Sequence, residues 1–543
     1  MKIKSVLLVA CLLTFVSSFA ASKIEIKGAW YYLNGERFFI KAIGYEIGAR
    51  PGQHPYEGVR ADNLDLLAFD LKVIKEAGYN AIRTWSQFSE PQLKLVQASG
   101  LKLIMGIDVN PEKDYGDAAF VRQCQEKVHQ VLSYARKYDC IITYLILNEP
   151  QTDHVHAVTG NAFSQLMKTL IDQIHLEHPG IPVTISANAM ISDYIDENLF
   201  DVYAYNCYDH SEAQTATMGM KDYIRGLISL QGLKKPFIST EFGYSVSHKG
   251  FGRYGGNTLE EQSKGLIANY RDLLDAGATG MCPFYYADGW WKGGDAFYHN
   301  ADQPEEWFGF WGYSDVNDKY GSPRPVWFAM RDYMKGLILS PKNKEIFFTD
   351  TLPVELYTDG TVRKVLVKDR DRVLKSISIL KEGYRAEQLV LQTVGIEDRE
   401  LSFEFYDQAG LLLKSESIQL LVSSTPFELP TLHIEVTPDK DLNDGKLACI
   451  KTTISMQPNF KLNGDLRVSF NTHLGWEVGP QATVPLKGMS EVVENFFHIP
   501  DNCWVVNASA GVSVRYGKFE FRIHDMKVRY RGDWAKTIGQ ETH

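Results

Sequence analysis

The stretch Tyr144-Leu-Ile-Leu-Asn-Glu-Pro150 is a short apolar run that ends in Asn-Glu-Pro. A run of this length and composition is typical of a buried strand, and the proline that follows favours a change of backbone structure. A similar boundary occurs in Phe237-Ile-Ser-Thr-Glu-Phe-Gly243. Each stretch therefore predicts a strand that carries a glutamate, Glu149 or Glu241, at its carboxyl end.

Short apolar runs of this kind recur between residues 23 and 340, and amphipathic stretches of helical period such as Leu64–Glu76 and Phe163–His178 lie between them. Strand then helix, repeated eight times over about 300 residues, predicts a closed (β/α)8 TIM barrel of the α/β class. An open doubly wound sheet is the alternative, but no glycine-rich phosphate loop follows the first run. The predicted strands are Phe38–Ile43, Ala81–Thr84, Leu103–Ile107, Tyr144–Leu147, Val183–Ser186, Val202–Tyr205, Phe237–Thr240 and Met281–Tyr285.

Strand patterns flank the predicted barrel on both sides. Ala29–Lys41 predicts a hairpin that turns at Asn34-Gly35, which we expect to close the bottom of the barrel. After Pro341, alternating strands replace helices, with a turn expected at Asp359-Gly360. We expect two all-β sandwich domains of Ig-like type, at residues 343–425 and 430–535.

The chain begins with a pattern typical of a secretory signal peptide at residues 1–20. Lys2 and Lys4 precede the apolar run Val6–Phe19, and Ser18-Phe-Ala20 offers a cleavage site. The expected location is extracellular or periplasmic. Leu8-Val-Ala-Cys11 also fits a lipobox, so a lipid anchor on Cys11 is the alternative.

Charge and cysteine content exclude several classes of partner. The net charge is −10, and cleavage after Ala20 makes it −12, which argues against nucleic acid as a partner. No later run is long and apolar enough to span a membrane. Cys449 and Cys503 either pair or remain buried thiols, and the cysteines lack the close spacing of a metal site, so no cofactor is expected.

Glu149 and Glu241 follow the fourth and seventh predicted strands, and barrel enzymes place catalytic groups at these strand ends. Retaining glycoside hydrolysis needs two carboxyl groups: one attacks the anomeric carbon, and the other protonates the leaving oxygen and then deprotonates water. Asn-Glu-Pro alone also fits an ordinary helix start. The joint placement of both glutamates favours a retaining glycoside hydrolase.

Residues 36–335 resemble clan A of the glycoside hydrolases, which carry the acid/base after strand four and the nucleophile after strand seven. Asn148-Glu149-Pro150 is similar to the motif of family 5, and Thr240-Glu241-Phe-Gly243 to that of family 2. The resemblance implies that Glu149 is the acid/base and Glu241 the nucleophile. It also implies roles for Asn148 at the sugar 2-hydroxyl, for Arg83 in holding the nucleophile, and for Tyr208 beside it.

These roles agree with the chemistry of the side chains. Arg83 would keep Glu241 ionised through charge and hydrogen bonds. The charge of Glu241 would in turn raise the pKa of Glu149, which must be protonated in the first step.

Aromatic residues crowd the expected top face of the barrel and suit the apolar faces of sugars. Of Trp290 and Trp291, in a glycine-rich loop, we expect at least one to line the cleft. The further candidates for substrate contact are Tyr45, Trp85 and Asp108, with Glu46 after strand one.

A single barrel with an aromatic top predicts an endo-acting β-glycanase on a β-linked polysaccharide or its oligosaccharides. Phe39-Ile-Lys-Ala-Ile-Gly-Tyr-Glu46 is similar to family 2 barrels and to β-1,3-glucan-active families, which places β-1,3-glucan ahead of β-mannan. The alternatives are a glycanosyltransferase with the same two glutamates and a non-catalytic carbohydrate-binding protein on a barrel scaffold.

Overall fold

A computed structural model describes most of the chain between residues 23 and 538. The predicted signal peptide with Cys11, and Cys503 with its possible bond to Cys449, lie outside the described residues. The described ranges are 23–46, 49–55, 63–109, 115–150, 162–188, 197–208, 218–230, 234–438, 446–472, 480–488, 490–501, 505–530 and 533–538.

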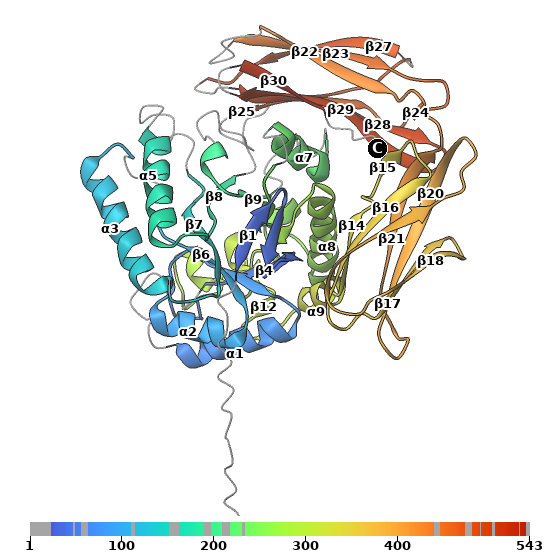
Figure 1. The fold of residues 1–543 in the computed structure, drawn as a ribbon. Helices are drawn as coiled ribbons and strands as arrows, with labels where there is room; N and C mark the ends of the chain where they lie inside the picture. The colour runs from blue at the N-terminus through green and yellow to red at the C-terminus, as the bar shows by residue number, and fades with distance from the viewer. Residues whose placement is uncertain are drawn as a thin grey trace, which may run out of the picture.

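Eight parallel strands close into a barrel, which confirms the predicted TIM-barrel fold (Figure 1). The barrel closes where β11 pairs with both β10 and β4. Most residues of these strands are buried, because one face fills the barrel interior and the other is covered by helices. In order, the strands are β4 (Ile40–Gly44), β5 (Ala81–Arg83), β6 (Lys102–Gly106), β7 (Ile141–Asn148), β8 (Val183–Asn188), β9 (Tyr203–Asn206), β10 (Phe237–Glu241) and β11 (Gly280–Met281).

Amphipathic helices surround the barrel and turn their apolar sides to it. A capping box at Thr258 opens α8: Thr258 Oγ1 accepts from Glu261 N, and Glu261 Oε2 accepts from Thr258 N. The helices are α1 (Leu64–Glu76), α2 (Glu90–Ser99), α3 (Ala118–Ala135), α5 (Ala162–Glu177), α7 (Met220–Leu230), α8 (Leu259–Asp275) and α9 (Pro325–Tyr333).

A small sheet of β1 (Ile24–Lys27), β2 (Trp30–Leu33) and β3 (Glu36–Phe38) closes the bottom of the barrel, as expected. The turn at Asn34-Gly35 has positive φ at both residues, as a two-residue hairpin requires. The Tyr31 hydroxyl reaches into the barrel and lies 2.7 Å from Thr143 Oγ1. The active face must therefore be the opposite, carboxyl end of the strands.

The first β-sandwich follows α9 directly and begins with β14 at Gly336, four residues before the barrel boundary predicted at residue 340. The turn at Asp359-Gly360 does not form a hairpin, because β16 and β17 lie in different sheets. Both strands turn apolar residues, such as Leu356 and Val365, into the core between the sheets. One sheet holds β14 (Gly336–Ser340), β16 (Thr351–Thr358) and β19 (Gly383–Val390), and the other β15 (Glu345–Phe347), β21 (Leu412–Ser423), β20 (Ile396–Tyr406), β17 (Lys364–Asp369) and β18 (Arg372–Ser378).

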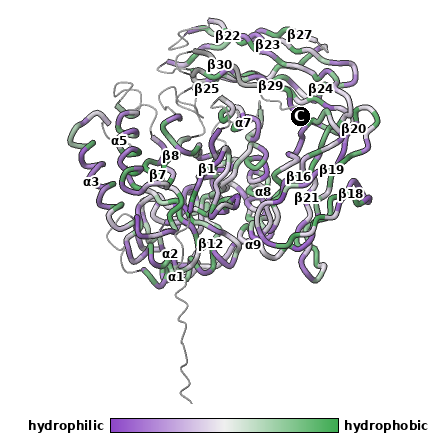
Figure 2. Tube along the Cα trace, viewed as in Figure 1, coloured by the Kyte–Doolittle hydropathy of each residue, from purple (hydrophilic) through white to green (hydrophobic). Residues whose placement is uncertain are grey.

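The second β-sandwich has its own apolar core, and polar and apolar residues alternate along many of its strands (Figure 2). One sheet holds β22 (Thr431–Thr437), β23 (Leu447–Ser455) and β27 (Ser490–His498). The other holds β24 (Lys461–Leu462), β25 (Leu466–Thr472), β26 (Gln481–Val484), β28 (Val505–Tyr516), β29 (Phe519–Tyr530) and β30 (Asp533–Ile538).

The two sandwiches lie against the side of the barrel, the first beside α8 and α9 and the second over α7 (Figure 1). Buried charges join the first sandwich to the barrel. Arg271 of α8 contacts Asp275 at 2.5 Å and Glu416 of β21 at 3.7 Å. Within the part of the chain that the structure describes, no helix has the length and apolar character needed to cross a membrane.

Candidate active site

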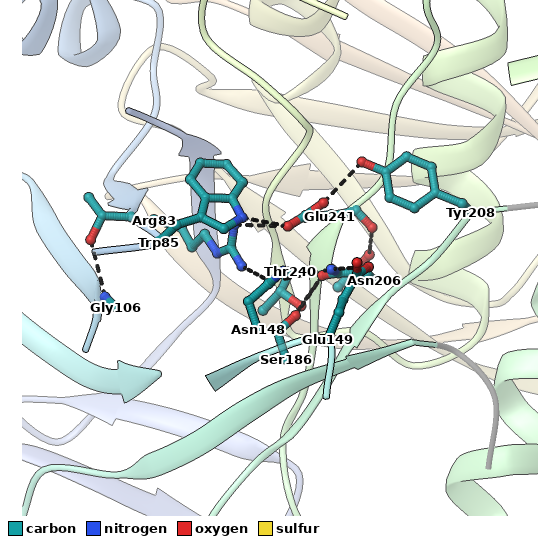
Figure 3. A network of polar contacts seen from close by, with 12 residues as sticks. Arg83, Trp85, Gly106, Asn148, Glu149, Ser186, Asn206, Tyr208, Thr240 and Glu241 are labelled. Atoms are coloured by element: carbon teal, nitrogen blue, oxygen red, sulfur yellow. Dashed lines mark hydrogen bonds and ion pairs between the residues drawn. The ribbon is translucent and has the colours of Figure 1, made fainter. Parts of the chain in front are cut away.

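Four polar side chains stand at the last residue of four barrel strands. Arg83 ends β5, Asn148 ends β7, Asn206 ends β9 and Glu241 ends β10. Because the strands are parallel, these residues meet at one face, where they form a single hydrogen-bonded network (Figure 3). Glu149, which directly follows Asn148, joins the same network.

Glu241 is buried and accepts three hydrogen bonds. Arg83 Nη1 and Trp85 Nε1 donate to Oε1 at 3.0 and 2.8 Å, and the Tyr208 hydroxyl donates to Oε2 at 3.2 Å. Arg83 is fully buried, and its guanidinium carbon lies 3.8 Å from the centre of the Trp85 ring. Three donors and a buried cation favour the ionised carboxylate.

The environment of Glu149 favours its protonated form. Burial, and next the negative charge of Glu241, raise the pKa of Glu149 to about 7. Its backbone has a φ of 48°, in the left-handed region that side chains other than glycine seldom adopt. Such conformations cost roughly 1–3 kcal/mol and concentrate at functional sites. Glu149 is therefore able to carry a proton near neutral pH.

Asn206 is a member of the network that the sequence analysis did not single out. Its Nδ2 donates to Glu149 Oε1 at 2.7 Å and lies 3.4 Å from Asn148 Oδ1. Its Oδ1 accepts from the hydroxyls of Ser186 and Thr240, at 2.6 and 2.9 Å. The signal was available, because Asn206 directly follows the sixth apolar run, just as Asn148 and Glu241 follow theirs.

The orientation of the Asn206 amide follows from its neighbours. Arg83 Nη2 donates to Asn148 Oδ1 at 2.5 Å, and a guanidinium can only donate. Asn148 Oδ1 is therefore an acceptor, so the group facing both it and Glu149 must be the NH₂ of Asn206. Glu149 Oε1 is thus an acceptor, which leaves Oε2 as the oxygen that holds the proton.

The two neighbouring tryptophans predicted to contact the substrate lie in different surroundings. Trp291 Nε1 donates to Glu46 Oε2 at 3.3 Å, and burial raises the pKa of Glu46. The charge of Glu241 contributes to that shift, which places Trp291 on the site side of its loop. Trp290 is buried and stacks on His299, with ring centres 4.8 Å apart.

Tyr45 and Asp108 lie apart from the network. Tyr45 is buried, and its hydroxyl donates to Asp70 of α1 at 2.7 Å, so it is a core residue and its expected sugar contact is wrong. Asp108 has a half-exposed side chain that faces Lys127 of α3, at 3.4 Å. Successive side chains along an extended segment point to opposite sides. The residue type alone does not tell which of them faces the site.

A second charged group adjoins Glu241. Lys292 Nζ lies 3.8 Å from Glu305 Oε2, and the Lys292 charge also acts on Glu46. Burial, opposed by Lys292, raises the pKa of Glu305. Glu305 has no strand run before it and gave no signal in the sequence. Within the described ranges, no group of three or more His, Cys, Asp or Glu side chains is arranged to hold a metal ion.

Comparisons with known proteins agree with this geometry. A family model described as glucanosyltransferase matches residues 14–267, slightly less than half of the chain, and includes both glutamates. No curated protein sequence matches the chain.

Solved structures of low identity also match most of the chain. A β-glucuronidase from Parabacteroides merdae is 13% identical, with a TM-score of 0.45 over 93% of this chain, which spans 64% of that enzyme's length. One from Bacteroides uniformis is 13% identical, with a TM-score of 0.48 over 91% of this chain and 67% of the other. These likenesses say nothing about the substrate. Family match, closed barrel and the two strand-end glutamates agree, and the chain carries a barrel of clan A of the glycoside hydrolases.

Proposed function

We propose that the protein is a retaining enzyme that acts on β-glucan through a covalent glycosyl-enzyme on Glu241, with Glu149 as acid/base. The observation that carries the proposal is the difference between the environments of the two carboxyl groups. Glu241 accepts bonds from Arg83, Trp85 and Tyr208, whereas the pKa of Glu149 is raised to about 7. Such a pair of environments separates a nucleophile from a proton donor.

In the first step, a Glu241 carboxylate oxygen attacks the anomeric carbon and the glycosidic C–O bond breaks. The proton on Glu149 Oε2 passes to the departing oxygen, and the bonding electrons stay with that oxygen. Glu149 is then ionised, and Asn206 Nδ2 remains bonded to Oε1. The negative charge of Glu241 is lost in the ester, so the charged state of Glu149 becomes more favourable.

In the second step, an incoming hydroxyl gives its proton to Glu149, and its oxygen attacks the anomeric carbon. The bond between the sugar and Glu241 breaks and the carboxylate is restored. Two inversions retain the configuration. The hydroxyl belongs to water in hydrolysis and to a second sugar in transfer.

The family match favours transfer as the outcome to test first, since the matching model is described as glucanosyltransferase. Endo-acting hydrolysis of β-1,3-glucan by the same residues is the second candidate, and β-mannan is a less favoured substrate. We propose that the enzyme is secreted, because the substrate is a polysaccharide and the chain begins with a signal-like segment.

The test is incubation of the enzyme with reduced β-1,3-glucan oligosaccharides, with products measured by mass spectrometry. Products longer than the substrate mean transfer, and shorter products alone mean hydrolysis. Glu149→Gln and Glu241→Gln serve as matched variants, and both should abolish the reaction. Unchanged products in either variant contradict the assignment, and a substrate panel that includes mannan tests the sugar.

A further inference from the structure

The loop that follows β11 carries aromatic rings both at the active site and beyond it. It contains the short helical turns η4 (Trp290–Gly293) and η5 (Pro304–Glu306). Near its start, Trp291 bonds to Glu46, and near its end Glu305 faces Lys292. At its outer part, Phe297 and Tyr298 are 70% and 62% exposed.

The outer part of this loop is fixed by hydrogen bonds. Asp295 Oδ1 accepts from Phe297 N at 2.9 Å, and Gly52 N donates to Ala296 O at 2.6 Å. Asn300 N donates to Glu306 Oε2 at 2.7 Å. The two exposed rings are therefore held on an ordered support, which lowers the entropy lost when a ligand binds.

The segment that follows β4 contacts both Trp291 and the exposed Phe297. His54 lies edge-on against Trp291, with ring centres 4.8 Å apart. Two residues earlier, a Cβ at Gly52 would lie 3.1 Å from the Phe297 ring. The same strand-one segment thus contacts Trp291 near the site and Phe297 farther along, so the rings follow one strip of backbone.

The loop after β10 contacts the loop after β11 and adds a third exposed ring. Phe251 is 72% exposed. The two loops are joined by an ion pair of 2.6 Å between Lys249 and Asp302 and by a hydrogen bond from His248 N to Ala301 O. Exposed apolar rings on two adjoining loops indicate a binding surface, and the C–H faces of sugar rings suit them.

We propose that Phe297 and Tyr298, beyond Trp291, form a distal subsite that binds sugar units of the β-glucan chain far from the cleaved bond. This inference rests on the proposed function. The subsite makes affinity depend on chain length, because short oligosaccharides reach only the carboxylates and Trp291, whereas longer ones also cover Phe297 and Tyr298.

The experiment measures binding of β-1,3-linked trisaccharide and octasaccharide to the Glu241→Gln protein by calorimetry. In the same background, Phe297→Ala with Tyr298→Ala should weaken octasaccharide binding about tenfold, which is ~1.4 kcal/mol, and leave the trisaccharide unchanged. Phe496→Ala is the matched control, because this ring is 61% exposed but lies on β27 of the second sandwich.

The outcomes separate this inference from the proposed function. Octasaccharide affinity that is equal with and without the two rings overturns the distal subsite and leaves the catalytic assignment intact. A loss of the same size for both oligosaccharides also overturns it, because the effect then lies at the catalytic centre. If the wild-type enzyme converts no β-1,3-glucan at all, the proposed substrate fails, and the subsite fails with it.

Discussion

The side-chain amide of Asn206 donates to Glu149 Oε1 at 2.7 Å, and this bond opposes the two largest influences that raise the pKa of Glu149. Burial and the charge of Glu241 favour the protonated acid, whereas the Asn206 amide favours the carboxylate. The balance lies at about 7, where the group is able both to give and to take a proton.

Replacement of Asn206 by alanine removes the larger of the two influences that favour the Glu149 carboxylate, the other being the charge of Arg83. The pKa of Glu149 should then rise above about 7, so the protonated form persists to higher pH. In the pH profile of kcat/KM, the limb on the basic side should shift to higher pH. A purely structural role would lower the rate at every pH without moving that limb, which would contradict the prediction.

Replacement of Glu241 by glutamine removes the neighbouring charge, the second largest cause that raises the pKa of Glu149. The pKa of Glu149 should therefore fall below about 7. Carboxyl ¹³C NMR with labelled glutamate measures it, and Glu149→Gln assigns the resonance. Glu260→Gln, in an exposed pair on α8, is the control and should leave it unchanged. An unaltered Glu149 titration in Glu241→Gln would show that the two carboxyl groups do not interact.

Replacement of Trp85 by phenylalanine keeps a ring beneath Arg83 but removes the donor to Glu241 Oε1. Hydrogen bonds to charged groups are worth about 1.5–3 kcal/mol, so kcat/KM should fall roughly 10- to 100-fold. Trp311→Phe is the matched control, since Trp311 is buried and its Nε1 bonds nothing among the residues that the structure describes. Equal losses in the two variants would mean that ring packing, not the hydrogen bond, matters.

Replacement of Arg271 by leucine should loosen the first sandwich from the barrel. The change leaves Asp275 buried without its guanidinium partner, and breaking a buried ion pair costs about 3–5 kcal/mol. It also removes the charge of α8 that faces Glu416, which keeps its pair with Lys414 at 2.8 Å. A lower Tm in calorimetry checks this. Lys264→Ala breaks the exposed pair with Glu260 and should leave the Tm nearly unchanged. Similar Tm values for both variants would mean that the buried charges do not stabilise the junction.

The barrel was predictable because its strands are buried on both faces and therefore read as apolar runs. Each predicted run overlaps a barrel strand, and Asn34-Gly35 marks its hairpin. The sheets of the first sandwich were harder to assign. Asp359-Gly360 predicts a turn, but a turn signal does not say whether the next strand pairs with the last one or crosses to the opposite sheet.

The place of the two proposed catalytic glutamates at strand ends was predictable, whereas the residues that contact them were harder to predict. The same rule that found Asn148 and Glu241 would have found Asn206, had it been applied to every strand. Tyr45 misled because it directly follows β4 but turns outward to Asp70, while the next residue, Glu46, lies near the site. Glu305 comes from a long loop, whose path depends on tertiary contacts that no local pattern records.

The central claim is that Glu241 forms the covalent bond to the sugar, and a trapped intermediate tests it most directly. A 2-deoxy-2-fluoro β-glucosyl substrate with a good leaving group slows the second step more than the first, so the glycosyl-enzyme accumulates. Digestion and mass spectrometry then locate the sugar. The account predicts one added sugar on the peptide that contains Glu241 and none in Glu241→Gln. A sugar attached to Glu149, or a wild-type enzyme that turns the substrate over without any adduct, would contradict it.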